Sequence, residues 1–279
     1  LPADALDALQ RARLAGVPIS AEPPALYDLA VDALLGLGAA RAPDGVMARW
    51  LERMYRSGLP VLSVDLPSGL NADTGAAMFD FGHTAPRHCL SLLTLKPGLF
   101  TAHGRDAAGE IWFDDLGCTS GSEPPAALLN PPPADKARLH ATHKGSYGDV
   151  AVLGGAPGMA GAALLAASAA LHGGAGRVFV GLLDEAQPAL SPTQPELMLR
   201  NPASLDWPQL TAVCGCGGGT AVQSLLPRVL TEAPRAVIDA DALNAIASSG
   251  TLQALLSGRK GKGQQTVLTP HPLEAARLL

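Results

Sequence analysis

Residues 143–162 have the sequence HKGSYGDVAVLGGAPGMAGA. The apolar run Val150–Leu153 predicts a strand, and the glycines after it predict a turn that leads into a helix over 160–172. This order brings free backbone N–H groups to a helix N-terminus, where they and the helix dipole stabilise a phosphate. The helix is almost all Ala, Leu and Ser, so another layer must pack closely against it. A second apolar strand, Arg177–Leu183, completes a βαβ unit whose ligand end faces the glycines.

Length and composition limit the class of protein. A chain of 279 residues predicts about two domains, and 47% apolar with 16% charged residues suits a globular core. The net charge of −5 argues against a nucleic-acid partner, which usually selects a basic surface. No apolar run approaches the roughly 18 residues of a membrane span. Because no secretory signal segment is recognisable either, we expect a cytoplasmic protein with no membrane partner.

The four cysteines give no metal or disulfide pattern. They are Cys89, Cys118, Cys214 and Cys216, and the last two stand too close to pair easily and lack metal-site spacing. We therefore expect four reduced, structural thiols.

The first half of the chain alternates helical and apolar segments. Helices are expected over 3–14 and 47–57, and strands over 26–35, 59–66, 90–95 and 111–116. Asp32 lies near the end of the first of these strands, and Asp65 at the end of the second. In open α/β sheets ligands gather at the carboxyl ends of strands, so Asp65 is either a ligand-binding carboxylate or a loop cap.

A proline-rich stretch separates the two halves. Proline runs sustain neither a ladder nor a helix, so we predict a domain at 1–120, a linker at 121–138 and a second domain at 139–279. In the second domain further strands are expected over 211–213, 236–238 and 265–268, with a helix over 221–230. Successive strands end in polar or glycine-rich turns, which favours an α/β three-layer sandwich.

Several motifs resemble one known family. The opening stretch, DADALN at 239–244 and TPHPLE at 269–274 resemble the dehydratase domain of the NAD(P)H-hydrate repair proteins, which is ribokinase-like. VDALLGLG at 31–38, VDLPSGL at 64–70 and LKPGL at 95–99 resemble the companion epimerase domain. The resemblance implies a Rossmann-like three-layer epimerase domain followed by a ribokinase-like α/β three-layer domain.

This resemblance also implies two activities. The epimerase interconverts the R and S forms of NADH or NADPH hydrated at the nicotinamide ring. The dehydratase uses ADP, or ATP in some members, to phosphorylate the ring hydroxyl of the S form, and loss of phosphate restores NADH or NADPH. The expected ligands are thus the hydrated nucleotides (NADHX and NADPHX), ADP or ATP, potassium and magnesium, and the family resemblance suggests a homo-oligomer.

Matched position by position, the epimerase motifs imply a set of site residues. Asp32 and Ser68 match potassium-binding positions, and Asp65 matches the carboxylate at the reacting ring. A carboxylate there can move a proton as acid and base. The substrate-contacting loop corresponds to Gly36, Leu37, Gly38, Ala39, Ala40, Arg41 and Ala42.

In the dehydratase half, the resemblance places the hydrated nucleotide against Gly161 or its neighbour Ala162, against Gly217 or Gly219, and against His271. Small residues let the backbone approach a bulky ligand closely. His271 donates a hydrogen bond or meets a phosphate in this interpretation; otherwise it is a rigid loop histidine between two prolines.

Two further features allow a functional or a plain structural interpretation. Lys144 either holds a phosphate as a point charge or is a solvated loop lysine. Asp239 and Asp241 either position magnesium or substrate, or cap the helix that begins near Ala242.

The pattern departs from the family at both ends. No Asn- and Gly-rich loop precedes Leu26, and no Gly-x-Gly-Asp motif, whose Asp is the catalytic base of the family, follows His271. We therefore expect a chain truncated at both ends, lacking the dehydratase base and part of the epimerase pocket. The alternatives are a ribokinase-like kinase of a vitamin precursor or other small molecule, and a nucleotide-binding module without activity.

Overall fold

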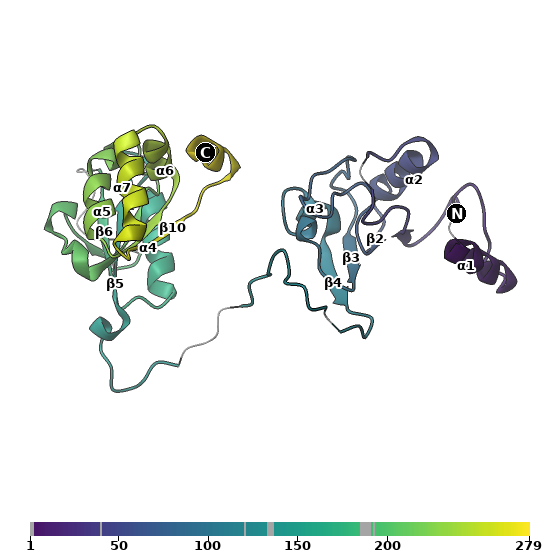
Figure 1. Ribbon diagram of the computed structural model, residues 1–279, viewed down its shortest axis with the longest axis horizontal. Helices are drawn as coiled ribbons and strands as arrows, with labels where there is room; N and C mark the ends of the chain where they lie inside the picture. Colours follow the sequence, from purple (N-terminus) through teal and green to yellow (C-terminus); the bar gives the residue numbers. More distant parts are fainter. Residues whose placement is uncertain (1–2, 40, 120, 133–136, 185–190, 192) are drawn as a thin grey trace. The chain divides into compact units, whose positions relative to one another are not determined.

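The structure, a computed structural model, describes residues 3–279 except 40, 120, 133–136, 185–190 and 192 (Figure 1). The chain divides into two compact units, Leu1–Pro133 and Ala134–Leu279, and each contains its own parallel β-sheet. The division falls in the proline-rich stretch, while the exact domain limits stay a prediction. In the described part of the chain, no helix combines the length and the apolar character needed to span a membrane.

The first unit is built on a sheet with the strands in sequence order. Its strands, all parallel, are β1 (Ala30–Asp32), β2 (Val61–Val64), β3 (Arg87–Leu92) and β4 (Glu110–Asp114). Its helices are α1 (Ala3–Leu14), α2 (Gly45–Arg56), the 3₁₀ turn η1 (Pro97–Leu99) and α3 (Gly104–Ala108).

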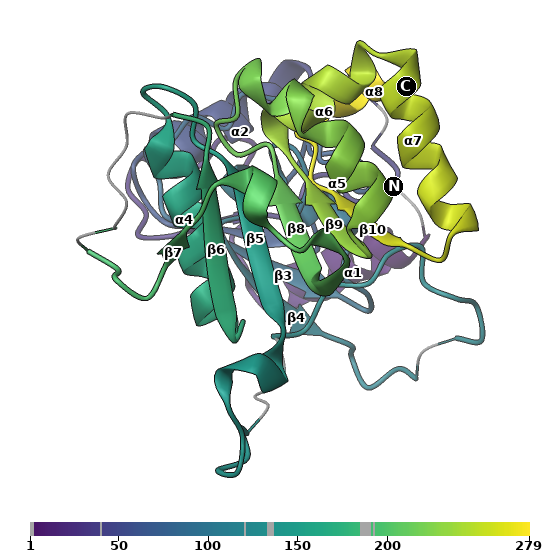
Figure 2. The ribbon, with the colours of Figure 1, turned by 90° about the vertical axis from the view of Figure 1, so that its left-hand side faces the viewer.

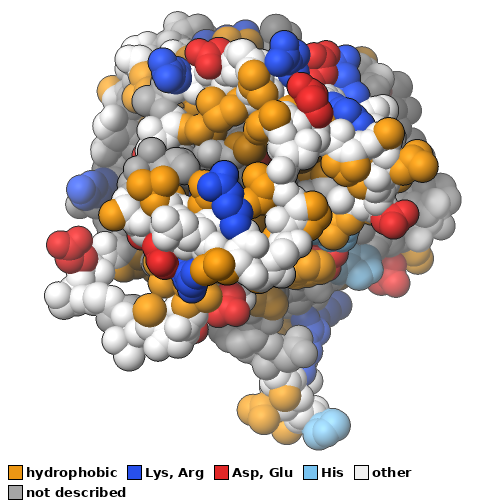
Figure 3. Space-filling view, turned by 90° about the vertical axis from the view of Figure 1, so that its right-hand side faces the viewer, with side chains coloured by type: hydrophobic (Ala, Val, Ile, Leu, Met, Phe, Trp, Pro, Cys, Tyr) orange, Lys and Arg blue, Asp and Glu red, His pale blue; other side chains and the backbone are white. Residues whose placement is uncertain are grey.

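One face of this sheet carries the core of the unit. Leu51 and Tyr55 of α2 and Ala107 of α3 pack with Val61 and Cys89 in one buried cluster. The other face is more open, and it includes Val31 and Trp112, which are 52% and 48% exposed. Figure 3, a space-filling view, shows hydrophobic side chains between charged ones on the surface. The described residues thus form two of the three expected layers.

The first strand is much shorter than its apolar sequence predicts. A strand over Leu26–Leu35 is wrong in extent, because β1 pairs with β2 only from Ala30 to Asp32. Beyond Asp32 the backbone turns away to meet Ser68, whose hydroxyl accepts the N–H of Leu35. The strand expected over 90–95 instead starts at Arg87 and stops at Leu92, since Leu93 adopts a positive φ of 64°.

The second unit has a six-stranded parallel sheet in the order β10-β9-β8-β5-β6-β7 (Figure 2). The strands are β5 (Asp149–Gly154), β6 (Arg177–Leu182), β7 (Met198–Leu199), β8 (Leu210–Cys214), β9 (Arg235–Ile238) and β10 (Gln265–Leu268). The helices are α4 (Ala160–His172), α5 (Leu226–Glu232), α6 (Ala240–Ala247), α7 (Gly250–Gly261) and α8 (Pro272–Leu278). Short 3₁₀ turns are η2 (Lys144–Tyr147), η3 (Pro202–Ser204), η4 (Trp207–Gln209) and η5 (Ala221–Ser224).

Separate cores cover the two faces of this sheet. On one face Ala163 and Ala167 of α4 pack with Val152 and Val178, which confirms the close helix packing expected from the Ala-rich sequence. On the other face side chains of α5 and α6 form a larger cluster around Leu153. Figure 2 shows α4 behind the sheet and α5 in front of it. The expected α/β three-layer arrangement is confirmed for this unit.

One predicted helix is divided in two. The segment expected as a helix over 221–230 forms η5 and then α5, with Leu225 between them. Pro227 lies in the first turn of α5 and has no N–H for the i→i−4 bond that a continuous helix would need.

Candidate functional site

Asp32 and Ser68 meet at the carboxyl end of β1. Asp32 is completely buried. Its carboxylate accepts the Ser68 hydroxyl at 2.6 Å and the Ser68 backbone N–H at 2.8 Å. The Ser68 hydroxyl also lies 3.3 Å from the carbonyl oxygen of Leu35. The structure therefore brings together the two residues expected to hold potassium.

Tyr55 is a third member of this cluster, which sequence reasoning missed. Its hydroxyl lies 3.0 Å from both Asp32 Oδ2 and Ser63 Oγ. Burial of the phenol and then the negative charge of Asp32 raise the pKa of Tyr55 above its ordinary value. The hydroxyl therefore stays protonated and donates to the carboxylate. The sequence indicates only that Tyr55 lies in the helix expected over 47–57.

Asp65 directly follows β2 and lies beside the end of β3. Its backbone is in the left-handed region, with φ at 70°, a conformation that Asp tolerates better than most residues. Oδ1 accepts the backbone N–H of Leu92 at 3.0 Å and forms an ion pair with Lys96. Asp65 thus stands at a strand end, as expected. Of its two carboxylate oxygens, Oδ1 is held by Leu92 and Lys96.

The loop after β1 opens onto a cavity of about 510 Å³, lined by Leu34–Ala39, Arg41–Asp44 and Met47. Arg41 is exposed, and α2 begins at this cavity with Asp44 as its N-cap. The Asp44 side chain makes no capping bond, so the first N–H groups of the twelve-residue helix remain available. Arg41 and the helix N-terminus together suit an anionic group. The predicted loop lines this cavity, except that Ala40 lies outside the described residues.

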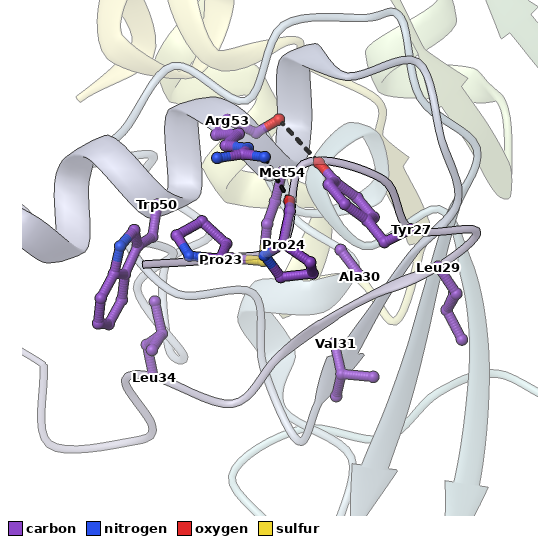
Figure 4. Close-up of a pocket in the computed structure, with 10 residues that line it drawn as sticks. All are labelled: Pro23, Pro24, Tyr27, Leu29, Ala30, Val31, Leu34, Trp50, Arg53 and Met54. Carbon is purple, nitrogen blue, oxygen red and sulfur yellow. Dashed lines mark hydrogen bonds between the residues drawn. The ribbon is translucent and has the colours of Figure 1, made fainter. Parts of the chain in front are cut away.

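A second, apolar cavity of about 250 Å³ adjoins β1 and α2 and shares Leu34 with the first (Figure 4). Trp50 and Tyr27 contribute aromatic rings to its wall. The Tyr27 hydroxyl donates to the carbonyl of Arg53 at 3.4 Å, which ties the loop before β1 to α2. In the sequence, Trp50 is only one residue of the helix expected over 47–57, which does not reveal this cavity.

In the second unit the sheet order defines where a ligand belongs. The chain runs from β5 to β6 and β7 on one side, then returns to β8, β9 and β10 on the other. The carboxyl ends of β5 and β8 therefore form the topological switch point, where open α/β sheets bind ligands. The turns after these two strands are joined by hydrogen bonds from Gly155 N to Cys216 O at 3.1 Å and from Ala156 N to Gly217 O at 2.7 Å.

Small residues are needed in both turns. A Cβ on Gly154 would lie 2.1 Å from the carbonyl oxygen of Cys216. Gly217 has φ at 59°, and a Cβ there would lie 3.0 Å from the Cβ of Ala162. Nothing lies within 4 Å of the Cβ position of Gly161, so that side of the helix start is open. Of the predicted residues, Ala162 and Gly217 are thus adjacent, and Gly219 lies in the same turn as Gly217.

Asp239 and Asp241 connect the strand ends rather than cap α6. Asp239 is the N-cap residue, but its side chain makes no capping hydrogen bond. It accepts the hydroxyl of Thr269 at 2.7 Å instead, which joins β9 to β10. Asp241 accepts the backbone N–H of Gly219 at 2.8 Å and so fixes the second glycine turn. The capping interpretation is therefore wrong, because other donors occupy these oxygens.

His271 begins α8. Its Nδ1 accepts the backbone N–H groups of Leu273 and Glu274 at 3.1 and 3.4 Å, and Glu274 accepts the N–H of His271 in return. This reciprocal capping fixes the ring with Nδ1 unprotonated. Nε2 of this exposed side chain lies 3.4 Å from Oε1 of Glu274, so both ring nitrogens have a partner within the chain.

Lys144 lies at the wrong end of the sheet for the phosphate role. It precedes β5, whereas the glycine turn follows β5, and six residues of strand span roughly 20 Å. Lys144 is exposed in η2, which agrees with the solvated loop lysine.

The donor atoms of the described residues show which metal ions they could bind. Among residues with described positions, no three His, Cys, Asp or Glu side chains form a metal-binding group. Asp32, Ser68 and the Leu35 carbonyl offer only oxygen atoms, which suits a hard cation such as potassium. Asp239 and Asp241 accept the Thr269 hydroxyl and the Gly219 N–H, and within the described residues neither belongs to a group of three possible metal ligands.

The two compact units, each with its own parallel sheet, define a two-domain α/β protein. Comparison with known families makes this assignment specific. Residues 1–98 match the family described as YjeF-related protein N-terminus, and residues 150–279 match the NAD(P)H-hydrate dehydratase family. The chain thus consists of the two domain types of the NAD(P)H-hydrate repair proteins.

Individual relatives agree with this. The chain is 35% identical over 272 residues to the bifunctional NAD(P)H-hydrate repair enzyme Nnr of Escherichia coli, covering 92% of this chain and 50% of that protein. It is 42% identical over 151 residues to the ADP-dependent (S)-NAD(P)H-hydrate dehydratase of Neisseria meningitidis, covering 52% of this chain and 50% of the relative. It thus spans about half the length of these relatives.

A solved structure also matches. The ADP/ATP-dependent NAD(P)H-hydrate dehydratase of Bacillus subtilis, co-crystallised with ATP and Mg²⁺, is 28% identical with a TM-score of 0.41. The match covers 51% of this chain and 50% of that one.

Proposed function

We propose that this chain acts in the repair of hydrated NADH and NADPH, with the first unit epimerising the R and S hydrates. The observation that carries the proposal is the position of Asp65, fixed at a strand end in a domain of the YjeF-related family. The cavity lined by Arg41 and the start of α2 would take the phosphates of the nucleotide.

The chemistry follows from the carbon that bears both a hydroxyl and the ring nitrogen. Asp65 in its acid form gives a proton to the hydroxyl, the C–O bond breaks, and water leaves with the electron pair. The resulting cation is delocalised onto the ring nitrogen, and the carboxylate stabilises it electrostatically. Water then adds to the opposite face and releases a proton to solvent, and Asp65 takes up a proton from solvent, which completes the epimerisation without net change in atoms.

Potassium is proposed as a resident cation of the first unit. Asp32, Ser68 and the Leu35 carbonyl would hold it, beside the loop that lines the phosphate cavity. A cation there supplies positive charge next to the nucleotide phosphates.

For the second unit we propose a site for the S hydrate and for ADP-dependent dehydration. The hydrate would lie at the switch point between β5 and β8, against Gly161, Ala162, Gly217, Gly219 and His271. ADP or ATP, with magnesium bound to its phosphates, would supply the group that activates the hydroxyl. The relative named as ADP-dependent dehydratase supports this proposal.

We also propose the cellular compartment and the binding partners of the protein. Four free cysteines fit a reducing compartment, so we place the protein in the cytoplasm. We propose NADHX, NADPHX and ADP as its ligands, no nucleic-acid or membrane partner, and self-association into a homo-oligomer.

The test uses separated R and S hydrates. Chromatography should show interconversion of either form, and in a chain that also carries the Gly-x-Gly-Asp motif, addition of ADP should release phosphate as the absorbance of reduced nicotinamide rises. Net phosphorylation of a stable alcohol without that rise would favour the small-molecule kinase. Tight ADP binding without any turnover would favour a binding module.

A further inference from the structure

Lys96 is a buried cation beside the proposed catalytic carboxylate. It is only 5% exposed, although it lies in the turn between β3 and η1. Its ammonium contacts Oδ1 of Asp65, the carbonyl of Leu92 at 2.7 Å and the hydroxyl of Ser91 at 3.4 Å. Lysine has three N–H donors and no acceptor, so these three oxygens use all of its hydrogen-bonding capacity.

The two oxygens of Asp65 have different surroundings. Oδ1 takes both Lys96 and the N–H of Leu92, while within the described residues Oδ2 makes no hydrogen bond. The backbone N–H of Asp65 donates to Leu90 at 2.7 Å, so the residue is attached to β3 at its main chain as well. The carboxylate can therefore rotate little, and Oδ2 stays in a fixed position.

Stability alone is a poor explanation for this arrangement. Burying an ion pair removes two charges from water, and well-packed apolar side chains of similar size often serve the fold equally well or better. Asp65 also occupies a left-handed backbone conformation, and such strain is concentrated at functional sites.

We propose that Lys96 is a positioning residue for the epimerisation: it holds Oδ1 of Asp65, so that Oδ2 is the oxygen that exchanges the proton with the substrate hydroxyl. Lys96 itself transfers no proton, because its ammonium is fully used by protein oxygens. This inference rests on the proposed epimerase function. It assigns a role to a residue of the LKPGL motif that has no expected role from the sequence.

The test compares Lys96→Met, Lys96→Arg and the matched control Lys260→Met, which makes the same change at an exposed position of the second unit. Loss of orientation should lower kcat of Lys96→Met by about 100-fold. KM should stay within about threefold, because the phosphate cavity is untouched. The arginine variant, which keeps the charge, should recover part of the lost kcat, and the control should match the wild type.

Two results would overturn the inference while leaving the proposed function intact: a Lys96→Met variant with wild-type kcat, or a loss seen in KM alone. A wild-type chain that does not interconvert the hydrates would instead refute the proposed function. The contact itself is then measured by hydrogen exchange of the Leu92 amide, which shares Oδ1 with Lys96. Lys96→Met should speed this exchange at least about tenfold, and an unchanged rate would show that Lys96 does not hold the carboxylate.

Discussion

The hydroxyl of Ser68 lies 2.6 Å from the carboxylate of Asp32, a residue with no exposure to solvent. If these oxygens hold potassium, Ser68→Ala should raise the potassium concentration for half-maximal epimerisation by about tenfold, the loss expected for one ligand. Ser63→Ala is the matched control, since Ser63 is the cross-strand neighbour of Asp32 but its hydroxyl is hydrogen-bonded to Tyr55. Titrating potassium chloride against activity gives the result, and equal shifts in both variants would contradict the assignment.

Arg259 should be the polar side chain on which the second unit most depends for stability. It is 1% exposed and donates to the carbonyls of Leu230 and Ala233 at 2.9 and 3.0 Å, at the end of α5. Arg259→Met leaves these buried acceptors unpaired, which should lower the free energy of unfolding by about 3 kcal/mol. Arg228→Met removes a half-exposed ion pair with Glu232 and should cost less than about 1 kcal/mol. Urea denaturation of both variants checks this, and equal losses would refute the role of Arg259.

Asp241→Asn should weaken binding of the S hydrate by the second unit. The change replaces a charged acceptor of the Gly219 N–H, so the turn loses about 1–2 kcal/mol of its anchoring and affinity falls about tenfold. The exposed Asp206, which lies in a different part of the unit, provides the control variant Asp206→Asn. Calorimetric titration with the hydrate gives both constants. Unchanged affinity in Asp241→Asn would show that this turn does not contact the ligand.

Alkaline pH should destabilise the second unit through its buried thiols. Burial, and then the charge of Asp239, raise the pKa of Cys216 from 9.0 to about 11. Between these values the unfolded chain has lost the thiol proton and the folded chain has kept it, so stability falls as pH rises through this window. Melting temperatures at pH 8 and pH 10 should show a smaller decrease for Cys216→Ser than for Cys118→Ser, whose thiol is exposed. Equal decreases would argue against this linkage.

The sequence predicted features that depend on local pattern. The helix Ala160–His172 has the predicted bounds, because its small residues and flanking glycines act within the segment itself. The positions of Asp32 and Asp65 at strand ends were likewise predictable from the order of apolar runs and turns. By contrast, the length of β1 depends on which neighbour it pairs with, and no local pattern encodes that.

Contacts between distant segments decided the rest of the site. Tyr55 meets Asp32 across 23 residues, and Lys96 meets Asp65 across 31. The sequence around Tyr55 predicts only a helix, and the sequence around Lys96 predicts only a turn. Lys144 shows the opposite case: it is close to the glycine turn in sequence, but a whole strand separates the two in space.

The central claim, that Asp65 is the acid and base of an epimerase, is tested most directly by the rate of R-to-S conversion in Asp65→Asn. An amide keeps the size of the side chain and cannot exchange the proton, so the account predicts a fall in kcat of at least about 10³-fold in a folded protein. Conversion by Asp65→Asn at the rate of the wild type would contradict it.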